Sequence, residues 1–218
     1  MAVAPRLYVD SADVDRVGEL LRAGLVSGVT TNPTILERSG VRVGEIPDFY
    51  QRWVDEGAGE VFFQTWGTDA SAMLRHAEEL LAVGDRVGVK VPATREGFEA
   101  ARTLIDGGAT VLVTAVYSVA QALAAASYGA RYIAPYLGRL RDADLDGTAF
   151  IARMQEVCEG SGTDVLAASL RSADDIVELR LAGVPYFTAA PDVVLALLQD
   201  DVSDRSAEEF EAAIARIS

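Results

Sequence analysis

The sequence predicts a single (β/α)8 barrel followed by one extra helix. Short apolar runs alternate with longer segments of helical periodicity, the order typical of βα units around a parallel sheet. Eight such runs fit within 218 residues, a length suited to a compact barrel with short loops. A doubly wound open sheet has the same order of elements and is the alternative. No repeat or linker-like segment divides the chain, so residues 1–218 are interpreted as one domain.

The predicted elements follow one another in a regular order. Strands are expected at residues 6–10, 25–30, 60–65, 86–91, 110–115, 131–135, 164–169 and 184–189. Helices are expected at residues 11–24, 68–84, 94–108, 118–130, 148–160 and 172–183. Several helical segments open on Ser, Thr or Asp, which cap helix N-termini, and several close on Gly. A last helix at about 203–217 is left over after the eighth unit, and one interpretation is that it packs on a neighbouring subunit.

Composition excludes several classes of function. A net charge of −14 without any cluster of basic residues argues against nucleic-acid binding. No apolar run approaches the roughly 18 residues that span a bilayer, and the N-terminus lacks the pattern of a signal peptide, so a soluble, cytoplasmic protein is expected. The only histidine, His76, is expected at a helix surface, and the only cysteine, Cys158, is interpreted as a half-buried packing residue. These two residues cannot supply the usual zinc ligands, and no metal or other cofactor is expected.

Polar residues follow most of the apolar runs. In a barrel these positions lie at the C-terminal mouth, where the chemistry of this fold takes place. They are Asp10, Thr30, Asn32, Gln64, Lys90, Thr114, Tyr136, Arg139, Ser169 and Arg171. Each one alone could be a helix cap or a loop residue, but seven strand ends of this kind indicate a functional site.

Lys90 is the only lysine in a chain with eighteen arginines. In the run VGVKV the three valines share one face of a strand, and Gly88 and Lys90 share the other, because side chains alternate. The valine face suits the helix layer, which directs Lys90 into the barrel above the small Gly88. Burial favours a neutral amine that can attack a carbonyl, whereas a guanidinium keeps its proton. Lys90 is therefore interpreted as a Schiff-base nucleophile; a strand lysine that reaches solvent is the alternative.

Five short motifs occur in order along the chain: GVTTNPTIL (28–36), VKVPAT (89–94), TAVYSVAQAL (114–123), YIAPYLGRL (132–140) and LAASLR (166–171). Together they resemble the transaldolase family, specifically its small members that include fructose-6-phosphate aldolase. The resemblance extends from Leu7 to about Asp192. It implies a (β/α)8 barrel, a cofactor-independent enzyme of carbohydrate metabolism of the pentose phosphate type, and a ring-type homo-oligomer, a pentamer or a decamer.

The resemblance also implies a reaction and roles for the polar residues. Lys90 would attack the C2 ketone of a sugar phosphate, and the iminium would accept the electrons of the C3–C4 bond, leaving a three-carbon enamine that adds to an aldehyde. Asp10, Thr30 and Asn32 match family positions that orient sugar hydroxyls and the lysine. Thr114 matches a position beside the Schiff base.

Arg139, Ser169 and Arg171 match the phosphate-binding set of the family. Two guanidiniums and a hydroxyl suit a phosphate dianion in an otherwise acidic protein. The alternative for Arg171 is a pair with Asp174 or Asp175 at the start of the next helix.

Gln64 and Tyr136 bear on the activity within the family. In the members of the resembled family that are transaldolases proper, a glutamate stands at the position of Gln64 and a phenylalanine at the position of Tyr136. A glutamine has no proton to exchange at neutral pH, whereas a tyrosine hydroxyl can donate and accept one. The pair favours an enzyme like fructose-6-phosphate aldolase with Tyr136 as acid/base, and true transaldolase transfer, in a specialised sugar pathway, is the alternative. Tyr128 and Pro191 depart from the family pattern and bear on the shape of the mouth.

Two other classes of function stay open at this point. A pyridoxal-phosphate enzyme would use the same lysine and would be yellow, but the sequence carries no separate signature for that cofactor. A binding protein on an inactive barrel is opposed by the complete polar set at the strand ends.

Overall fold

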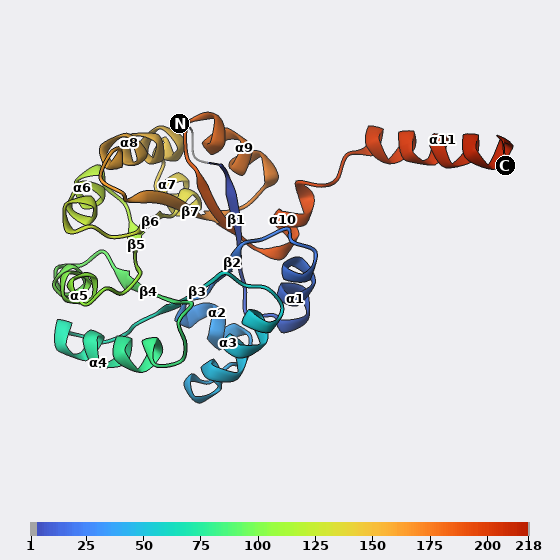
Figure 1. The fold of residues 1–218 in the computed structure, drawn as a ribbon. Helices are drawn as coiled ribbons and strands as arrows, with labels where there is room; N and C mark the ends of the chain where they lie inside the picture. The colour runs from blue at the N-terminus through green and yellow to red at the C-terminus, as the bar shows by residue number, and fades with distance from the viewer. Residues whose placement is uncertain (1–3, 218) are drawn as a thin grey trace.

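The computed structural model describes residues 4–217, and its strands close into one parallel barrel (Figure 1). The strands are β1 (Arg6–Asp10), β2 (Gly28–Thr30), β3 (Glu60–Gln64), β4 (Val87–Pro92), β5 (Val111–Val116), β6 (Tyr132–Pro135), β7 (Asp164–Leu170) and β8 (Tyr186–Ala189). They pair in sequence order, and β8 closes on β1 with Phe187 opposite Leu7. The predicted barrel is confirmed, and the open-sheet alternative is excluded.

Helices connect the strands and cover the outside of the sheet (Figure 1). They are α1 (Val14–Arg22), α2 (Pro33–Arg38), the 3₁₀ turn η1 (Val43–Glu45), α3 (Ile46–Asp55), α4 (Ala70–Leu81), α5 (Arg95–Asp106), α6 (Val119–Tyr128), α7 (Leu137–Asp142), α8 (Gly147–Cys158), α9 (Ala173–Leu181), α10 (Pro191–Ala196) and α11 (Asp201–Ile217). Thr94, Ser118 and Ser172 accept hydrogen bonds from first-turn N–H groups, as expected for caps. No helix was expected in residues 33–55, where α2, η1 and α3 lie.

Two strands begin at least two residues later than predicted. β2 begins only at Gly28, because the N–H of Leu25 donates to the carbonyl of Leu20 and so still belongs to the end of α1. β8 begins at Tyr186, because the preceding Pro185 has no N–H to give to the ladder.

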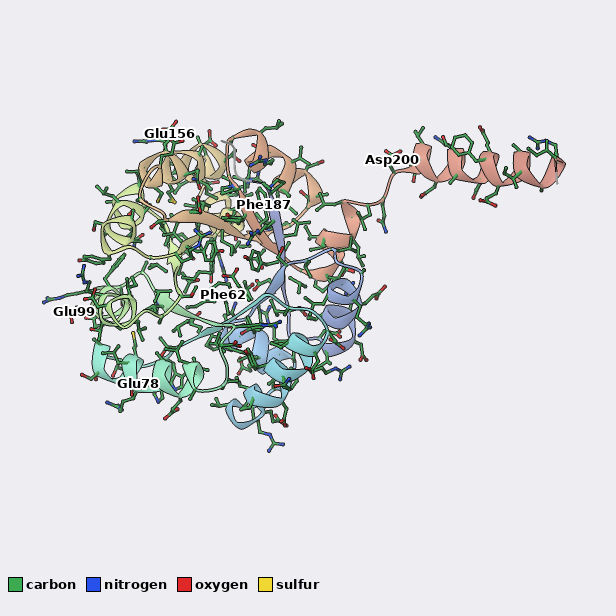
Figure 2. All side chains as sticks on the ribbon, in the orientation of Figure 1. Phe62, Glu78, Glu99, Glu156, Phe187 and Asp200 are labelled. Atoms are coloured by element: carbon green, nitrogen blue, oxygen red, sulfur yellow. The ribbon has the colours of Figure 1, made fainter. Side chains whose placement is uncertain are left out.

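Apolar side chains pack on both sides of the sheet. The three valines of β4 belong to the layer between sheet and helices. The interior of the barrel holds Tyr8, Phe62, Leu112, Tyr132, Leu166 and Tyr186. Phe62 lies in the middle of this interior (Figure 2) and fills the space that Gly88 leaves, since a Cβ atom on Gly88 would be 2.2 Å from the Phe62 ring. The predicted orientation of β4 is therefore confirmed, with Lys90 on the inner face.

Helix α11 projects away from the barrel (Figure 1) and buries none of its residues. Its apolar side chains Val202, Phe210, Ile214 and Ile217 are all more than half exposed. Within residues 4–217 no helix has the length and apolar character required to cross a bilayer.

His76 and Cys158 are both more buried than predicted. Cys158 is 1% exposed at the end of α8, and burial raises the pKa of its thiol to about 11. His76 is half-buried because its ring stacks on Trp66, with centroids 4.3 Å apart, and its Nδ1 lies 2.7 Å from the Trp66 carbonyl oxygen.

Candidate active site

A cavity of about 580 Å³ opens at the C-terminal ends of the strands. Most of the residues predicted from the sequence lie on its wall: Asp10, Asn32, Gln64, Lys90, Thr114, Tyr136, Arg139 and Ser169. Thr30 and Arg171 lie outside the wall. Residues far apart in the chain, contributed by β1 to β7 or the segments directly after them, therefore meet at one site.

Lys90 lies on β4 with 2% of its surface exposed, and Gln64 is its neighbour across the ladder. Burial lowers the pKa of the Lys90 amine, and the carboxylate of Asp10 partly opposes this by favouring the ammonium. No side chain in residues 4–217 holds the amine by a hydrogen bond or an ion pair. A buried amine at a cavity wall without such a partner is suited to nucleophilic attack once it is neutral.

The carboxylate of Asp10 is held by the buried Thr30, which in turn contacts the buried Thr188. Thr30 donates from Oγ1 to Asp10 Oδ1 at 2.6 Å, and its oxygen is also 2.7 Å from Oγ1 of Thr188. Both threonines are at most 1% exposed. Thr30 is thus placed to orient Asp10 rather than to contact a ligand.

Tyr136 faces the cavity from the start of α7. Its hydroxyl is 2.9 Å from Oγ1 of Thr114, and the Tyr117 ring packs edge-on against it with centroids 6.0 Å apart. Burial raises the pKa of the Tyr136 phenol. The phenol therefore carries its proton at neutral pH and can donate it.

Two irregularities turn further residues toward the cavity. The register shifts after Thr114 in β5 and after Ala167 in β7. Ala115 and Ser169, which follow, both have φ of 57°, in the left-handed region that costs about 1–2 kcal/mol for a residue with a side chain. Strict alternation would direct both away from the barrel interior, yet both line the cavity.

Ser169 and Arg171 converge on Gly138 in α7. A Cβ atom on Gly138 would lie 2.8 Å from both Ser169 Oγ and Arg171 Nε. The Arg171 guanidinium donates to Asp142 at 2.7 Å, whereas only its backbone N–H donates to Asp175. The predicted alternative, in which the Arg171 side chain pairs with Asp174 or Asp175, is wrong, because the guanidinium pairs with Asp142 instead.

The short helix α2 brings two polar side chains to the opposite part of the mouth. Asn32 caps α2, because its Oδ1 accepts from the N–H of Ile35 at 3.0 Å. Its amide nitrogen is then the group that can meet a ligand. Arg38, at the end of α2, is exposed and also lines the cavity.

The profile described as Transaldolase/Fructose-6-phosphate aldolase matches residues 7–218. The chain belongs to this family. A protein of Ruegeria sp. (strain TM1040) named probable transaldolase is 37% identical over 211 residues, 96% of each chain. Another probable transaldolase, from Cereibacter sphaeroides, is 37% identical over 95% of this chain and 94% of its own. Among solved structures, thiamine phosphate pyrophosphorylase from Pyrococcus furiosus aligns over 88% of this chain and 91% of its own with a TM-score of 0.62; at 20% identity this is a likeness of fold.

Three residues around the site of this transaldolase-family chain were not expected. Thr188 could have been found by alternation in the last strand, Arg38 lies just beyond the first family motif, and Tyr117 lies within the motif TAVYSVAQAL (114–123). Of the two departures from the family pattern, Tyr128 lies outside the cavity and packs against the outer helix α5, and Pro191 forms the first turn of α10.

Proposed function

We propose that the protein is a lysine Schiff-base enzyme that forms, cleaves or transfers a dihydroxyacetone unit on sugar phosphates. The observation that carries this proposal is the placement of Lys90, a buried amine with a lowered pKa on the wall of a polar cavity. Family membership supports it, because relatives that match over nearly the whole chain are named probable transaldolases.

The reaction uses the groups at the cavity wall. The neutral amine of Lys90 adds to the C2 ketone, and loss of water leaves a protonated imine whose charge the Asp10 carboxylate stabilises. As the C3–C4 bond breaks, its electron pair moves into the imine and the C4 hydroxyl loses its proton to solvent by way of Tyr136, so that an enamine and an aldehyde result. In the synthetic direction the enamine carbon attacks an aldehyde, and Tyr136 gives its proton to the new alkoxide. Hydrolysis of the imine then frees the product and the lysine.

Gln64 and Tyr136 favour an activity like that of fructose-6-phosphate aldolase. Gln64 cannot exchange a proton at neutral pH, whereas the Tyr136 hydroxyl points to Thr114 and remains protonated. True transaldolase transfer is the second candidate, favoured by the names of the relatives. Release of dihydroxyacetone from fructose 6-phosphate without an acceptor supports the aldolase, and turnover only after an aldose phosphate is added supports the transaldolase.

We propose that the phosphate of the substrate binds Arg139, Ser169 and Arg171. Ser169 Oγ and Arg171 Nε converge at Gly138, and Arg139 follows in the same helix. Guanidinium and hydroxyl donors together suit a dianion.

The Schiff base is tested by reduction. Incubation with fructose 6-phosphate followed by borohydride is expected to attach a three- or six-carbon adduct to the peptide that contains Lys90. Lys90→Arg is expected to lose turnover and labelling and to keep its fold, because the positive charge remains and the nucleophile does not. Arg75→Gln on the outer helix α4 is the control and should label like the parent protein. An unlabelled parent protein, or an active arginine variant, would exclude the mechanism.

We also propose that the protein is a homo-oligomer and that α11 packs on a neighbouring copy. An amphipathic helix of 17 residues with no buried residue leaves its apolar side chains in water, which burial against a second copy would relieve. Light scattering after size exclusion should give a multiple of 23.2 kDa for the parent protein and a smaller assembly for Phe210→Asp. A monomeric parent protein would refute this.

A further inference from the structure

Only two charged residues are buried in residues 4–217, Lys90 and Asp175. Lys90 lies on the wall of the candidate active site, whereas Asp175 lies in the first turn of α9, four residues after Arg171. A carboxylate is costly to bury unless hydrogen-bond donors or opposite charges satisfy it. The partners of Asp175 therefore show what its burial achieves.

The two oxygens of the Asp175 carboxylate bind different segments of the chain. Oδ2 accepts from the backbone N–H groups of Arg171 at 2.7 Å and of Ser172 at 3.2 Å. Oδ1 accepts from Nη1 of Arg141, in the last turn of α7, at 2.5 Å. Burial alone would raise the pKa of Asp175, but the hydrogen bonds from Arg171 and Arg141 hold it below its usual value. The carboxylate is therefore ionised at neutral pH.

A helix cap accounts for only one of the two oxygens. Ser172 and Asp175 form a capping box at the start of α9, in which the Asp175 side chain accepts from the Ser172 N–H. That cap requires neither a buried carboxylate nor a bond from Oδ1 to a different helix. The contact with Arg141 therefore has a purpose beyond the start of α9.

The bond between Arg141 and Asp175 joins the two segments that carry the proposed phosphate donors. Arg141 lies on α7, two residues after Arg139, and Asp175 holds the backbone of Arg171, which directly follows β7. The segments are closely packed, since a Cβ atom on Gly138 of α7 would lie 2.8 Å from Arg171 Nε. A shift of one segment against the other would thus change the spacing between the two guanidiniums.

A second ion pair between the same segments is more exposed. Arg171 donates from Nη2 to Asp142 at 2.7 Å, and these side chains are 59% and 45% exposed. The side chains of Arg141 and Asp175 are 40% and 7% exposed. Because water and salt screen the exposed pair more strongly, the pair with Asp175 holds the segments together more firmly.

We propose that Asp175 is a positioning residue for the substrate phosphate, because it ties the Arg171 backbone to α7 and so sets the spacing between the guanidiniums of Arg139 and Arg171. This inference rests on the proposed function, in which these two arginines bind the phosphate together with Ser169. Donors that are held in place before the ligand arrives lose less freedom on binding, which increases affinity. Asp175 thereby favours phosphorylated substrates over unphosphorylated ones without touching either.

The first test measures phosphate binding without the Schiff base. A hexitol 6-phosphate has no carbonyl to react with Lys90, so its calorimetric Kd reports the phosphate contacts. Asp175→Asn keeps the side-chain shape and an oxygen for the cap but loses the charge that binds Arg141. The Kd should rise about tenfold, the low end for a charge-assisted contact, because Arg171 is displaced and not removed.

Variants of the partner residues provide a second route and a matched control. Arg141→Gln should weaken binding as Asp175→Asn does, and Arg141→Lys should keep most of the affinity. Because the Arg141 side chain is partly exposed, these variants decide the matter if Asp175→Asn does not fold. Glu178→Gln removes the exposed partner of the same guanidinium, 2.9 Å from Nη2, and should bind like the parent protein.

Two further measurements separate positioning from a general structural role. In an Arg171→Gln background, Asp175→Asn should cause no further loss of affinity, because the guanidinium that Asp175 positions is already absent. In the addition of dihydroxyacetone to aldehydes, Asp175→Asn should raise KM for glyceraldehyde 3-phosphate about tenfold with kcat nearly unchanged. Its kinetics with unphosphorylated glyceraldehyde should match those of the parent protein.

The outcomes distinguish this inference from the proposed function. Parent-like Kd values in both Asp175→Asn and Arg141→Gln, or equal losses on the two aldehydes, would overturn the role of Asp175. If neither Arg139→Gln nor Arg171→Gln weakens binding of the hexitol 6-phosphate, the phosphate site is misplaced and the role of Asp175 fails with it. Failure of borohydride labelling at Lys90 would refute the Schiff base, and the calorimetric Kd values would still decide the role of Asp175.

Discussion

Removing the Tyr136 hydroxyl is expected to slow the reaction without preventing Schiff-base formation. Tyr136→Phe takes away the proposed acid/base, and such groups contribute about 10² to 10⁴ in rate. It also leaves the Thr114 hydroxyl, which is 1% exposed and 2.9 Å from the Tyr136 oxygen, without that partner. An unsatisfied buried hydroxyl costs about 1–3 kcal/mol of unfolding free energy.

The double variant with Thr114→Val decides whether the two residues act as one unit. Thr114→Val alone should lower kcat less than Tyr136→Phe does, because the phenol stays and only its orientation is lost. The double variant should be no slower than Tyr136→Phe and should recover part of the lost stability, since both hydroxyls are then absent. Steady-state kinetics with fructose 6-phosphate measure kcat, borohydride labelling measures Schiff-base formation, and urea unfolding measures stability. If the rate losses of the two single variants multiply in the double variant, Thr114 acts on the substrate independently of Tyr136. Near-normal turnover in Tyr136→Phe would mean that water supplies the proton and would favour transaldolase transfer.

Three further predictions concern Lys90 and two glycines. Lys90→Met should raise the melting temperature most at low pH, and the gain should shrink as the pH rises from the lowered pKa of Lys90 toward its usual 10.5. In that range the buried amine of the folded parent protein binds fewer protons than the amine of the unfolded chain, so the parent protein gains stability as the pH rises. A difference in melting temperature that does not change with pH would contradict the lowered pKa. Gly138→Ala should raise KM for phosphorylated substrates about tenfold and leave glyceraldehyde nearly unaffected, because its Cβ would displace Ser169 Oγ and Arg171 Nε; equal losses on both would contradict the phosphate site. Gly88→Ala should lower the unfolding free energy by about 1–3 kcal/mol in urea unfolding, because its Cβ would overlap the Phe62 ring; unchanged stability would contradict the tight interior.

The orientation of Lys90 could be predicted because alternation is a local rule. Once the valines of β4 are assigned to the helix layer, Gly88 and Lys90 must face inward, and the structure confirms both. The cap residues Thr94 and Ser118 were predictable for the same reason, since each acts within its own helix.

Features that depend on contacts between distant parts of the chain could not be predicted from the sequence. Thr188 supports Asp10 only through Thr30, 158 residues earlier in the chain, and no local pattern connects them. Arg171, directly after β7, pairs with Asp142 at the end of α7, although Asp174 and Asp175 are nearer in the sequence. Helix α2 was missed because its six residues are too few to display a period.

The left-handed residues Ala115 and Ser169 explain why strand alternation alone underestimates this cavity. Each follows a register shift, in β5 and β7, and each adds a residue to the wall that alternation assigns to the outside. A backbone that costs about 1–2 kcal/mol at each of two positions persists only where its surroundings hold it, and such residues gather at functional sites. Ser169 thereby directs its hydroxyl toward Gly138 and Arg171, where a regular strand would have turned it to the helix layer. The left-handed backbone at Ser169 in β7 therefore belongs to the proposed phosphate site, because it brings to that site the Ser169 hydroxyl, a donor that a regular strand would turn away from it.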